Sequence, residues 1–292
     1  LLYYINNPER LDLKKKQSNI KSKFFDVENI YNKFIKNIIN WLVMKKEIVI
    51  LAAGIGSRLR PMTDNIPKAM VKVNGIPILK NLLDQIFKIK TEKMKVNIVT
   101  GYCSKEIEKF TSGYKDITLI ENKVFDITNN MYSLNLALDI IDKNSQLIII
   151  NADCFYDFKI VKKMIAFENN DVIAVDKNFF SEESMKVKLN NDGYVNSISK
   201  NLPNTQNTYV SMDFYTFSSN TVLLLKQIIR NIINSGDNNS WTEVAIDILS
   251  RNKSTKISSC FFSEKWIEID DLNDLKTANK IFRDTWFITH LF

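Results

Sequence analysis

A short apolar run at residues 47–50 leads directly into the string LAAGIGSRLRPMTDNIPK at residues 51–68. We expect the apolar run to be a buried strand that turns at Gly54 and Gly56 into a helix beginning near Ser57. Glycines directly after a strand let the backbone come close to a polyphosphate, because no Cβ stands in the way. The N–H groups of such a turn, with a helix N-terminus behind them, form a binding site for anions. The string therefore predicts a phosphate-binding loop, and three basic residues lie near it: Arg58, Arg60 and Lys68.

Downstream of this loop, apolar strand-like runs alternate with segments of helical period. The first strands are expected at 47–53, 96–100, 117–120, 147–150 and 171–175, and the helices between them near 75–89, 104–111, 131–142 and 158–167. Later strands are expected at 185–190, 194–199, 209–217 and 265–269, with helices near 219–234, 240–251 and 272–282. This order predicts an α/β fold with a Rossmann-like, doubly wound, mostly parallel (mixed) sheet and helices on both faces. Such a sheet binds its ligand outside the carboxyl ends of its strands, near the switch point.

Carboxylates follow two of the predicted strands at places suited to a ligand. Asp153 comes after the apolar run at 147–150, where a carboxylate is well placed to hold a cation against a nucleotide. In the string WIEIDD at 266–271, alternate residues share one face of a strand, so Glu268 and Asp270 are expected to project together. Magnesium takes oxygen ligands and commonly binds through one or two carboxylates plus substrate phosphates. The pair therefore suits Mg²⁺, while Asp271 is expected to cap the next helix.

The string at 51–68 resembles the signature LAAGxGxRLxPxTxxxPK of nucleotidyltransferases that activate phosphorylated metabolites, and it fills every fixed position. These are the sugar-nucleotide pyrophosphorylases and their relatives. Two later stretches, NNMYSL at 129–134 and WIEIDDLNDLKTA at 266–278, resemble those of bacterial CTP:phosphocholine and phosphonate cytidylyltransferases. The resemblance covers residues 47–282 and implies the nucleotide-diphospho-sugar transferase type of fold.

The resemblance implies a Mg²⁺-dependent cytidylyltransferase. Such an enzyme transfers CMP from CTP to a small phosphorylated metabolite, for example phosphocholine or 2-aminoethylphosphonate, and releases pyrophosphate. The identity of the acceptor stays open. Two alternatives also stay open: a sugar-1-phosphate nucleotidyltransferase, and a non-catalytic relative that binds nucleotide without turnover.

The resemblance also implies roles for individual residues. Asp153 and Asp270 match the metal-binding positions, and it stays open whether Glu268 or Asp271 also contacts the metal. Arg58 would grip the β/γ-phosphates, and Lys68 would neutralise charge near the acceptor and the α-phosphate. The expected nucleotide-binding residues are Leu51, Ala52, Ala53, Gly54, Gly56, Ser57, Arg58, Gly101, Asn130 and Ser133. The expected acceptor-binding residues are Lys68, Tyr132, Asp213, Tyr215, Glu243 and Trp266.

The acceptor's charge bears on the choice among these side chains. Aromatic faces hold a quaternary ammonium well. A primary ammonium would prefer carboxylates such as Asp213 or Glu243. Most of the aromatic residues near the motifs are expected to belong to the core, so two or three of them at most would contact the acceptor.

The positive charge of the chain is concentrated at its N-terminus. Residues 1–46 hold ten Lys or Arg against four Asp or Glu, whereas the remaining residues hold 30 against 29. The net charge of +7 is therefore weak support for nucleic-acid binding by the main domain, and no nucleic-acid partner is expected. We expect residues 1–43 to be a basic extension or linker with one amphipathic helix, and residues 44–292 to be the nucleotidyltransferase domain.

Residue types that are scarce also limit the chemistry. The only histidine is His290, which argues against histidine-based acid–base catalysis and against His-ligated zinc. The three cysteines lack metal-type spacing and suit a reducing cytosol. No apolar run reaches the length of a membrane span, and the N-terminus lacks a signal-peptide pattern. We therefore expect a cytoplasmic enzyme, monomer or homodimer, that works with carboxylates, lysine, arginine and metal.

Overall fold

The computed structural model of the chain describes residues 44–178, 182–252 and 254–283. The expectations for residues 1–43 and the position of His290 lie outside these ranges. None of the described helices has both the length and the apolar character needed to cross a membrane.

A nine-stranded mixed sheet forms the centre of the described part of the chain. Four parallel strands make one half of it, in the spatial order β6–β1–β4–β5. They are β1 (Lys46–Ala52), β4 (Met94–Thr100), β5 (Ile117–Glu121) and β6 (Gln146–Asn151). The chain moves outward from β1 to β5 and then returns to the other side of β1 with β6. The strand order therefore reverses at β1, as in a doubly wound sheet.

The other half of the sheet is mostly antiparallel. Its strands are β8 (Val172–Asp176), β9 (Lys186–Leu189), β10 (Val195–Ser199), β11 (Thr208–Phe217) and β12 (Ser258–Phe262). The long strand β11 runs antiparallel to β6, β8 and β9, and β12 lies parallel to β8. Strand β12 was not predicted, because its sequence SSCFF has no alternation of polar and apolar residues.

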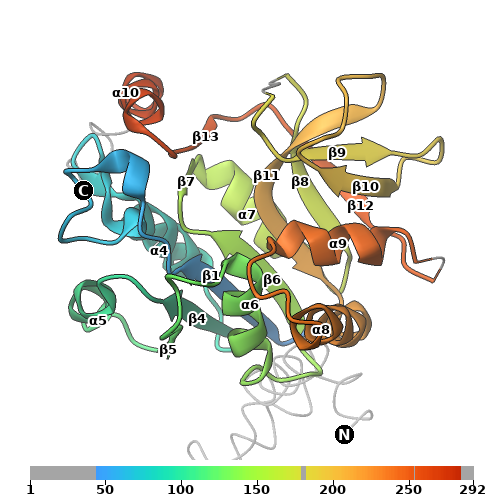
Figure 1. The fold of residues 1–292 in the computed structure, drawn as a ribbon, viewed down its shortest axis with the longest axis horizontal. Coiled ribbons are helices and arrows are strands. Elements are labelled where there is room, and N and C mark those ends of the chain that lie inside the picture. Colours follow the sequence, from blue (N-terminus) through green and yellow to red (C-terminus); the bar gives the residue numbers. More distant parts are fainter. Residues whose placement is uncertain (1–43, 179–181, 253, 284–292) are drawn as a thin grey trace, which may run out of the picture. The chain divides into compact units, whose positions relative to one another are not determined.

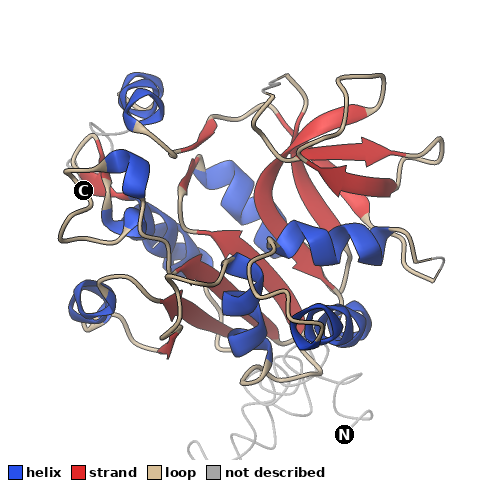
Figure 2. Cartoon of the chain, viewed as in Figure 1, coloured by secondary structure: helices blue, strands red, loops and turns tan. Residues whose placement is uncertain are grey.

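Helices cover both faces of the sheet, as predicted (Figures 1 and 2). One group packs on one face: α4 (Ile78–Ile89), α5 (Ser104–Thr111) and α7 (Phe158–Ala166). The other group packs on the opposite face: α6 (Asn130–Leu138), α8 (Ser219–Asn234) and α9 (Thr242–Ser250). Within β1, Ile48 and Ile50 belong to the first core, and Val49 and Leu51 belong to the second. Both faces of β1 are buried, which explains why its sequence is continuously apolar rather than alternating.

Two short ribbons and a C-terminal helix complete the described fold. One ribbon pairs β2 (Lys72–Val73) with β3 (Ile76–Pro77), and the other pairs β7 (Cys154–Tyr156) with β13 (Trp266–Glu268). Helix α10 (Leu272–Ile281) begins after Asp271, whose carboxylate accepts hydrogen bonds from the N–H groups of Asn273 and Asp274. The predicted capping role of Asp271 is therefore confirmed.

The expected helix after Gly56 is wrong. Only a single 3₁₀ turn, η1 (Ser57–Leu59), follows the glycine loop, and a second one, η2 (Lys68–Met70), closes the signature string. Pro61 follows this turn closely, and a proline there cannot donate the N–H that a continuing helix would need. The glycine loop therefore has no long helix behind it.

Candidate active site

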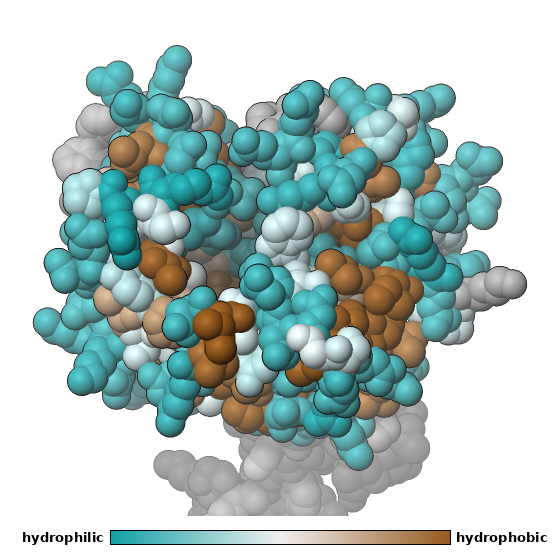
Figure 3. Space-filling model, in the orientation of Figure 1, coloured by the Kyte–Doolittle hydropathy of each residue, from teal (hydrophilic) through white to brown (hydrophobic). Residues whose placement is uncertain are grey.

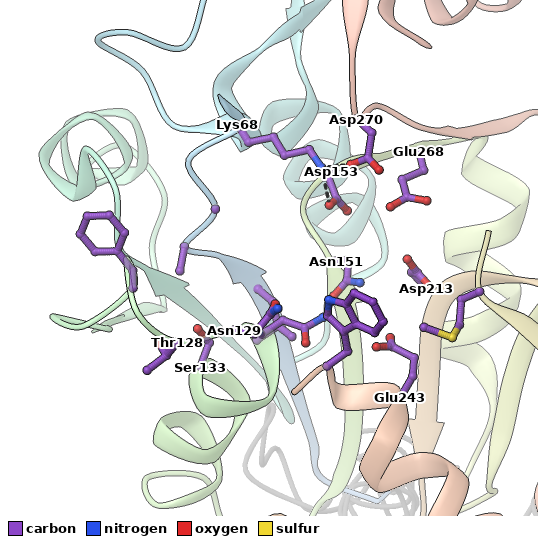
Figure 4. A pocket seen from close by; sticks show the side chains of 18 of the residues that line it. Lys68, Thr128, Asn129, Ser133, Asn151, Asp153, Asp213, Glu243, Glu268 and Asp270 are labelled. Carbon is purple, nitrogen blue, oxygen red and sulfur yellow. Dashed lines mark hydrogen bonds and ion pairs between the residues drawn. The ribbon is translucent and has the colours of Figure 1, made fainter. Parts of the chain in front are cut away.

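A cavity of about 370 Å³ lies at the carboxyl ends of β1 and β6, where the strand order reverses. Its wall combines the glycine loop with side chains from β6, β11, α6, α9 and the segment after β13. Figure 4 shows these side chains converging on one space. The cavity is therefore at the place predicted from the order of strands and helices.

The glycine loop forms one wall of the cavity. Six of the predicted nucleotide-binding residues line it here: Leu51, Ala53, Gly54, Gly56, Ser57 and Arg58. The loop is closed on itself, because the Lys68 N–H donates to the Gly54 carbonyl at 3.3 Å and the Thr63 hydroxyl donates to the Gly56 carbonyl at 2.7 Å. Gly56 has φ +68°, and a Cβ there would lie 3.1 Å from the Lys68 Cβ. A glycine is therefore needed for the loop to pass this close to Lys68.

Two other predicted nucleotide-binding residues lie behind this wall. Ala52 is buried in the core and does not line the cavity, because β1 alternates and turns this side chain toward α4 and α7. Gly101 also stays out of the lining, and a Cβ on it would lie 2.7 Å from the Phe125 Cβ and 2.9 Å from the Ala53 Cβ. Gly101 therefore allows Phe125 to pack close to the loop and reach the cavity.

Helix α6 supplies polar groups to the opposite wall. Asn130 and Ser133 both line the cavity, as predicted, because residues three apart share one face of a helix. The Asn130 side-chain oxygen accepts a hydrogen bond of 2.8 Å from the Thr242 N–H, and the Ser133 hydroxyl accepts one of 3.1 Å from Asn122. Tyr132 lies on another face of α6 and does not line the cavity. The placement therefore does not support contact between Tyr132 and the acceptor.

Three carboxylates meet at one end of the cavity. One oxygen from each of Asp153, Glu268 and Asp270 lies within 4.8 Å of the others. The β7–β13 ribbon brings them together, and the Ile269 N–H donates to the Asp153 carbonyl at 2.9 Å. Ile269 is fully buried, which turns its neighbours Glu268 and Asp270 outward to the cavity. The expected projection of these two carboxylates on one side of the strand is confirmed.

Two basic side chains of the signature string contact these carboxylates. The Lys68 ammonium donates to Asp153 Oδ2 at 2.8 Å and also to Asp270 Oδ1, and the Arg58 Nη2 lies 2.7 Å from Asp270 Oδ2 (Figure 4 shows Lys68 between the two aspartates). Burial alone would lower the pKa of Lys68, but Asp153 and Asp270 raise it above its ordinary value. Burial raises the pKa of Asp270, but Lys68 and Arg58 bring it below its ordinary range. The contacts with Lys68 and Arg58 therefore favour the charged forms of Lys68 and Asp270.

Glu268 differs from Asp153 and Asp270 because no lysine or arginine of the described residues forms an ion pair with it. Burial raises its pKa well above the ordinary value, and Asp213, Asp153 and Asp270 add to this effect. Three carboxylate oxygens this close together are the hard ligands that Mg²⁺ prefers, so the donor set fits this ion. Asp271 lies outside the group, because its carboxylate caps α10.

A second acidic pair, Asp213 and Glu243, lies further along the same wall. The Tyr215 hydroxyl lies 3.0 Å from Asp213 Oδ1 and 2.8 Å from Glu243 Oε1. Asp213 has φ +53° and lies where the register between β11 and β8 shifts. Burial, Glu243 and Asp153 raise the pKa of Asp213 to about 7, and burial also raises the pKa of Glu243. Tyr215 is fully buried behind the pair, so it holds the two carboxylates and does not itself line the cavity.

The orientation of helix α9 determines the position of Glu243. One side of the helix faces solvent, where Val244 and Ile248 are exposed, and Figure 3 shows an apolar patch over α9. The opposite side of the helix buries Ala245, Ile246 and Leu249 against the sheet. Glu243 lies on the inward side at the first turn of α9, with only 4% of its surface exposed.

Of the two tryptophans Trp241 and Trp266, it is Trp241 that lines the cavity, whereas Trp266 was the one expected to contact the acceptor. Trp241 lines the cavity, and the Lys200 ammonium lies 4.6 Å from the centre of its ring. Trp266 does not line the cavity, because its indole N–H donates to Asp176 at 2.6 Å and its ring stacks on Tyr156. The expectation that Trp266 contacts the acceptor is therefore not supported.

Several lining residues were not assigned a role from the sequence: Asn122, Phe125, Thr128, Asn129, Asn151, Met185, Lys200 and Trp241. Two of them carried a usable signal. Asn129 opens the NNMYSL stretch, and Asn151 stands two residues before Asp153 at the end of β6. The others come from loops or strand ends without a recognisable pattern.

Comparisons with known proteins agree with this geometry. Residues 47–284 match the protein family described as "Nucleotidyl transferase". The chain is 26% identical over 259 residues to the CTP:phosphoglutamine cytidylyltransferase of Campylobacter jejuni, a match that covers 78% of this chain and 97% of the relative. It is 28% identical over 104 residues to the 2-aminoethylphosphonate cytidylyltransferase of Lancefieldella rimae, a match that covers 36% of this chain and 42% of the relative.

A solved structure shows a similar fold. The CTP:phosphocholine cytidylyltransferase from Streptococcus pneumoniae superposes with a TM-score of 0.69 at 20% sequence identity. The superposition covers 82% of this chain and all of that one. At this identity the likeness concerns the fold, and it confirms the predicted doubly wound mixed sheet.

Proposed function

Because the chain belongs to the nucleotidyl transferase family, we propose that it transfers CMP from CTP to a small phosphorylated or phosphonylated metabolite and releases pyrophosphate. One observation carries the proposal: Arg58 and Lys68 of the signature loop contact the carboxylates of Asp153 and Asp270 inside a single cavity. The choice of CTP is supported by the NNMYSL and WIEIDD stretches and by the similarity to two cytidylyltransferases.

The chemistry needs few groups. An oxygen of the acceptor's phosphate attacks the α-phosphorus of CTP in line, the bond to the β-phosphate breaks, and pyrophosphate leaves. The acceptor oxygen is already anionic at pH 7, so no strong general base is required. Catalysis then depends on positioning and on neutralising charge in the transition state. This agrees with a cavity whose described lining includes carboxylates, lysines and an arginine but no histidine.

Each charged residue has a place in this scheme. Arg58 lies on the glycine loop and would grip the β/γ-phosphates, while Lys68 would neutralise charge between the α-phosphate and the acceptor. Asp153, Asp270 and Glu268 would hold Mg²⁺. A divalent cation bound there would supply neutralisation of the phosphate charge.

The glycine loop and α6 would hold the rest of the nucleotide. Leu51, Ala53 and Gly54 line the cavity with apolar side chains or, at Gly54, with none, which would suit the base and ribose. Asn130 and Ser133 face them from α6 and offer hydrogen-bonding groups to the base. Ala52 and Gly101 would act indirectly, by fixing β1 and by letting Phe125 approach the loop.

A sugar-1-phosphate nucleotidyltransferase is the second candidate. A UTP–glucose-1-phosphate uridylyltransferase of Haloferax volcanii is also a relative, at 30% identity over 180 residues. A pyrophosphate-release screen separates the candidates, with CTP, UTP, ATP and GTP each tested against phosphocholine, phosphoethanolamine, 2-aminoethylphosphonate and glucose 1-phosphate in the presence of Mg²⁺. We expect release with CTP and a small phosphate or phosphonate. Comparable release with UTP and glucose 1-phosphate would favour the sugar-1-phosphate nucleotidyltransferase. No release with any pair would refute nucleotidyl transfer by this chain.

A further inference from the structure

The acidic pair Asp213–Glu243 consists of two buried carboxyl groups without a bound cation in the described part of the chain. The two side chains are 7% and 4% exposed. Among the described residues, neither carboxylate forms an ion pair. Burial raises the pKa of both groups. Hydrogen bonds from Tyr215 and Asn151 offset this rise in pKa only in part at Asp213. Tyr215 and Lys200 offset the rise in pKa only in part at Glu243. A buried carboxylate is strongly disfavoured unless a positive charge or hydrogen bonds compensate it. A bound ligand with a positive group would favour the charged form of both carboxyl groups.

The pair is held in a fixed position toward the cavity. Tyr215 is fully buried and contacts one oxygen of each carboxylate, and Ser211 lies 3.0 Å from the same hydroxyl. Both carboxyl groups line the cavity, and Figure 4 shows Glu268, Asp213 and Glu243 one after the other along the same side of it. In this arrangement Asp213 has φ +53°, a backbone conformation that residues other than glycine adopt infrequently. Strained residues of this kind persist where the surrounding structure holds them and cluster at ligand sites.

The chemistry of the pair favours a cation with N–H groups. A primary ammonium has three donors, which suit two carboxylates side by side. A quaternary ammonium has none, and aromatic faces are what bind it well. The aromatic residues that line the cavity are Phe125 and Trp241. Phe125 packs beside Gly101 and Ala53 on the nucleotide side, and the ring of Trp241 already faces Lys200.

We propose that Asp213 and Glu243 bind the ammonium group of the acceptor, and that the site selects phosphates or phosphonates bearing a primary amine over those bearing a trimethylammonium. The inference rests on the proposed function. It names the acceptor class: a short molecule with a phosphate or phosphonate at one end, near Lys68, and a protonated primary amine at the other.

The test is a methylation series at constant length. Phosphoethanolamine and its N-methyl, N,N-dimethyl and N,N,N-trimethyl derivatives are compared as acceptors with CTP and Mg²⁺, with propyl phosphate as an uncharged analogue. We expect kcat/KM to fall by tenfold or more from the primary amine to the trimethylammonium. Equal or higher kcat/KM for the trimethyl compound would overturn the proposal.

Two isosteric variants link the preference to the pair. Glu243→Gln and Asp213→Asn are expected to lower kcat/KM for phosphoethanolamine at least tenfold, mainly through KM, while propyl phosphate changes by less than about threefold. Glu108→Gln, an exposed change on α5, is the matched control and should behave as wild type. An equal loss of kcat/KM with every acceptor, in variants that have the melting temperature of the wild type, would mean that the pair does not bind the ammonium group.

Calorimetric binding of the same acceptors, without turnover, separates failure of this inference from failure of the proposed function. Tighter binding of phosphoethanolamine than of phosphocholine, together with no pyrophosphate release from CTP, would retain the ammonium site and reject the cytidylyl transfer. Equal binding of the two compounds would reject the ammonium selectivity whether or not the chain turns over CTP.

Discussion

Replacing Lys68 by Met should separate the stability of the carboxylate cluster from its chemistry. The Lys68 side chain is 14% exposed, and its ammonium contacts Asp153 Oδ2 at 2.8 Å and Asp270 Oδ1. Met keeps most of the apolar stem but removes the charge. The variant therefore leaves two carboxylates close together with Arg58 as the remaining bound cation on Asp270.

The expected loss of stability is moderate. Removing one partner of a fully buried ion pair costs about 3–5 kcal/mol. Asp153 and Asp270 are 24% and 25% exposed, so water can compensate part of the lost interaction. We expect a loss of about 1–3 kcal/mol in the free energy of unfolding, or roughly 2–4 °C in Tm for each kcal/mol in a domain of this size. The variant should therefore remain folded at room temperature.

The expected effect on catalysis is much larger. Loss of one charged contact to a transition state typically lowers the rate about a hundred- to a thousandfold. Metal binding should change in the opposite direction, because the ammonium no longer competes for oxygens of Asp153 and Asp270. Steady-state kinetics, thermal melting and Mn²⁺ titration without nucleotide measure the three quantities, with the exposed Lys109→Met as the matched control. Turnover within about threefold of wild type, or weaker Mn²⁺ binding in the variant, would refute this reasoning.

Three further predictions follow from the described contacts. Gly56→Ala should lower both Tm and CTP affinity, because its Cβ would lie 3.1 Å from the Lys68 Cβ at φ +68°. In the control Gly113→Ala the new Cβ meets no atom within 4 Å, so neither Tm nor CTP affinity should change. Asp213→Asn should gain stability relative to wild type as the pH rises from 5 to 8; a difference in Tm that stays constant would contradict this. The reason is that the folded wild type holds a proton on Asp213 up to a pKa of about 7, whereas the unfolded chain releases it near the ordinary pKa of 3.8, so wild-type stability falls across that window. A chain that starts at Met44 is expected to fold and keep its transfer activity, and loss of activity in a version that still melts cooperatively would move the domain boundary.

The parts of the site that could be predicted from the sequence are those determined by local periodicity. The glycine loop follows from the two glycines directly after the apolar run of β1, and the outward pair Glu268 and Asp270 follows from alternation along a strand. The position of Asp153 follows from its place after a continuously apolar strand, since such strands end at the binding edge of a doubly wound sheet.

The parts that could not be predicted depend on pairing between distant segments. Trp241 and Trp266 are the same residue type, but only Trp266 lies in a recognised stretch, WIEIDD. Trp266 is removed from the cavity because β13 pairs with β7 and places its indole against Asp176. Trp241 reaches the cavity because it precedes the first turn of α9. The shared contact of Asp213 and Glu243 with one tyrosine depends on a register shift in β11 that no local pattern indicates.

Identification of the product in a competition reaction tests the central claim most directly. The enzyme and Mg²⁺ would receive equal concentrations of CTP, UTP, ATP and GTP together with phosphoethanolamine, 2-aminoethylphosphonate, phosphocholine and glucose 1-phosphate, and mass spectrometry would identify the adducts. The NNMYSL and WIEIDD stretches predict transfer of CMP, and the acidic pair of the cavity predicts an acceptor that bears a primary amine, so CMP joined to such an acceptor is expected as the main product. A nucleoside diphosphate glucose as the main product, or no adduct in a sample that melts cooperatively, would contradict the account.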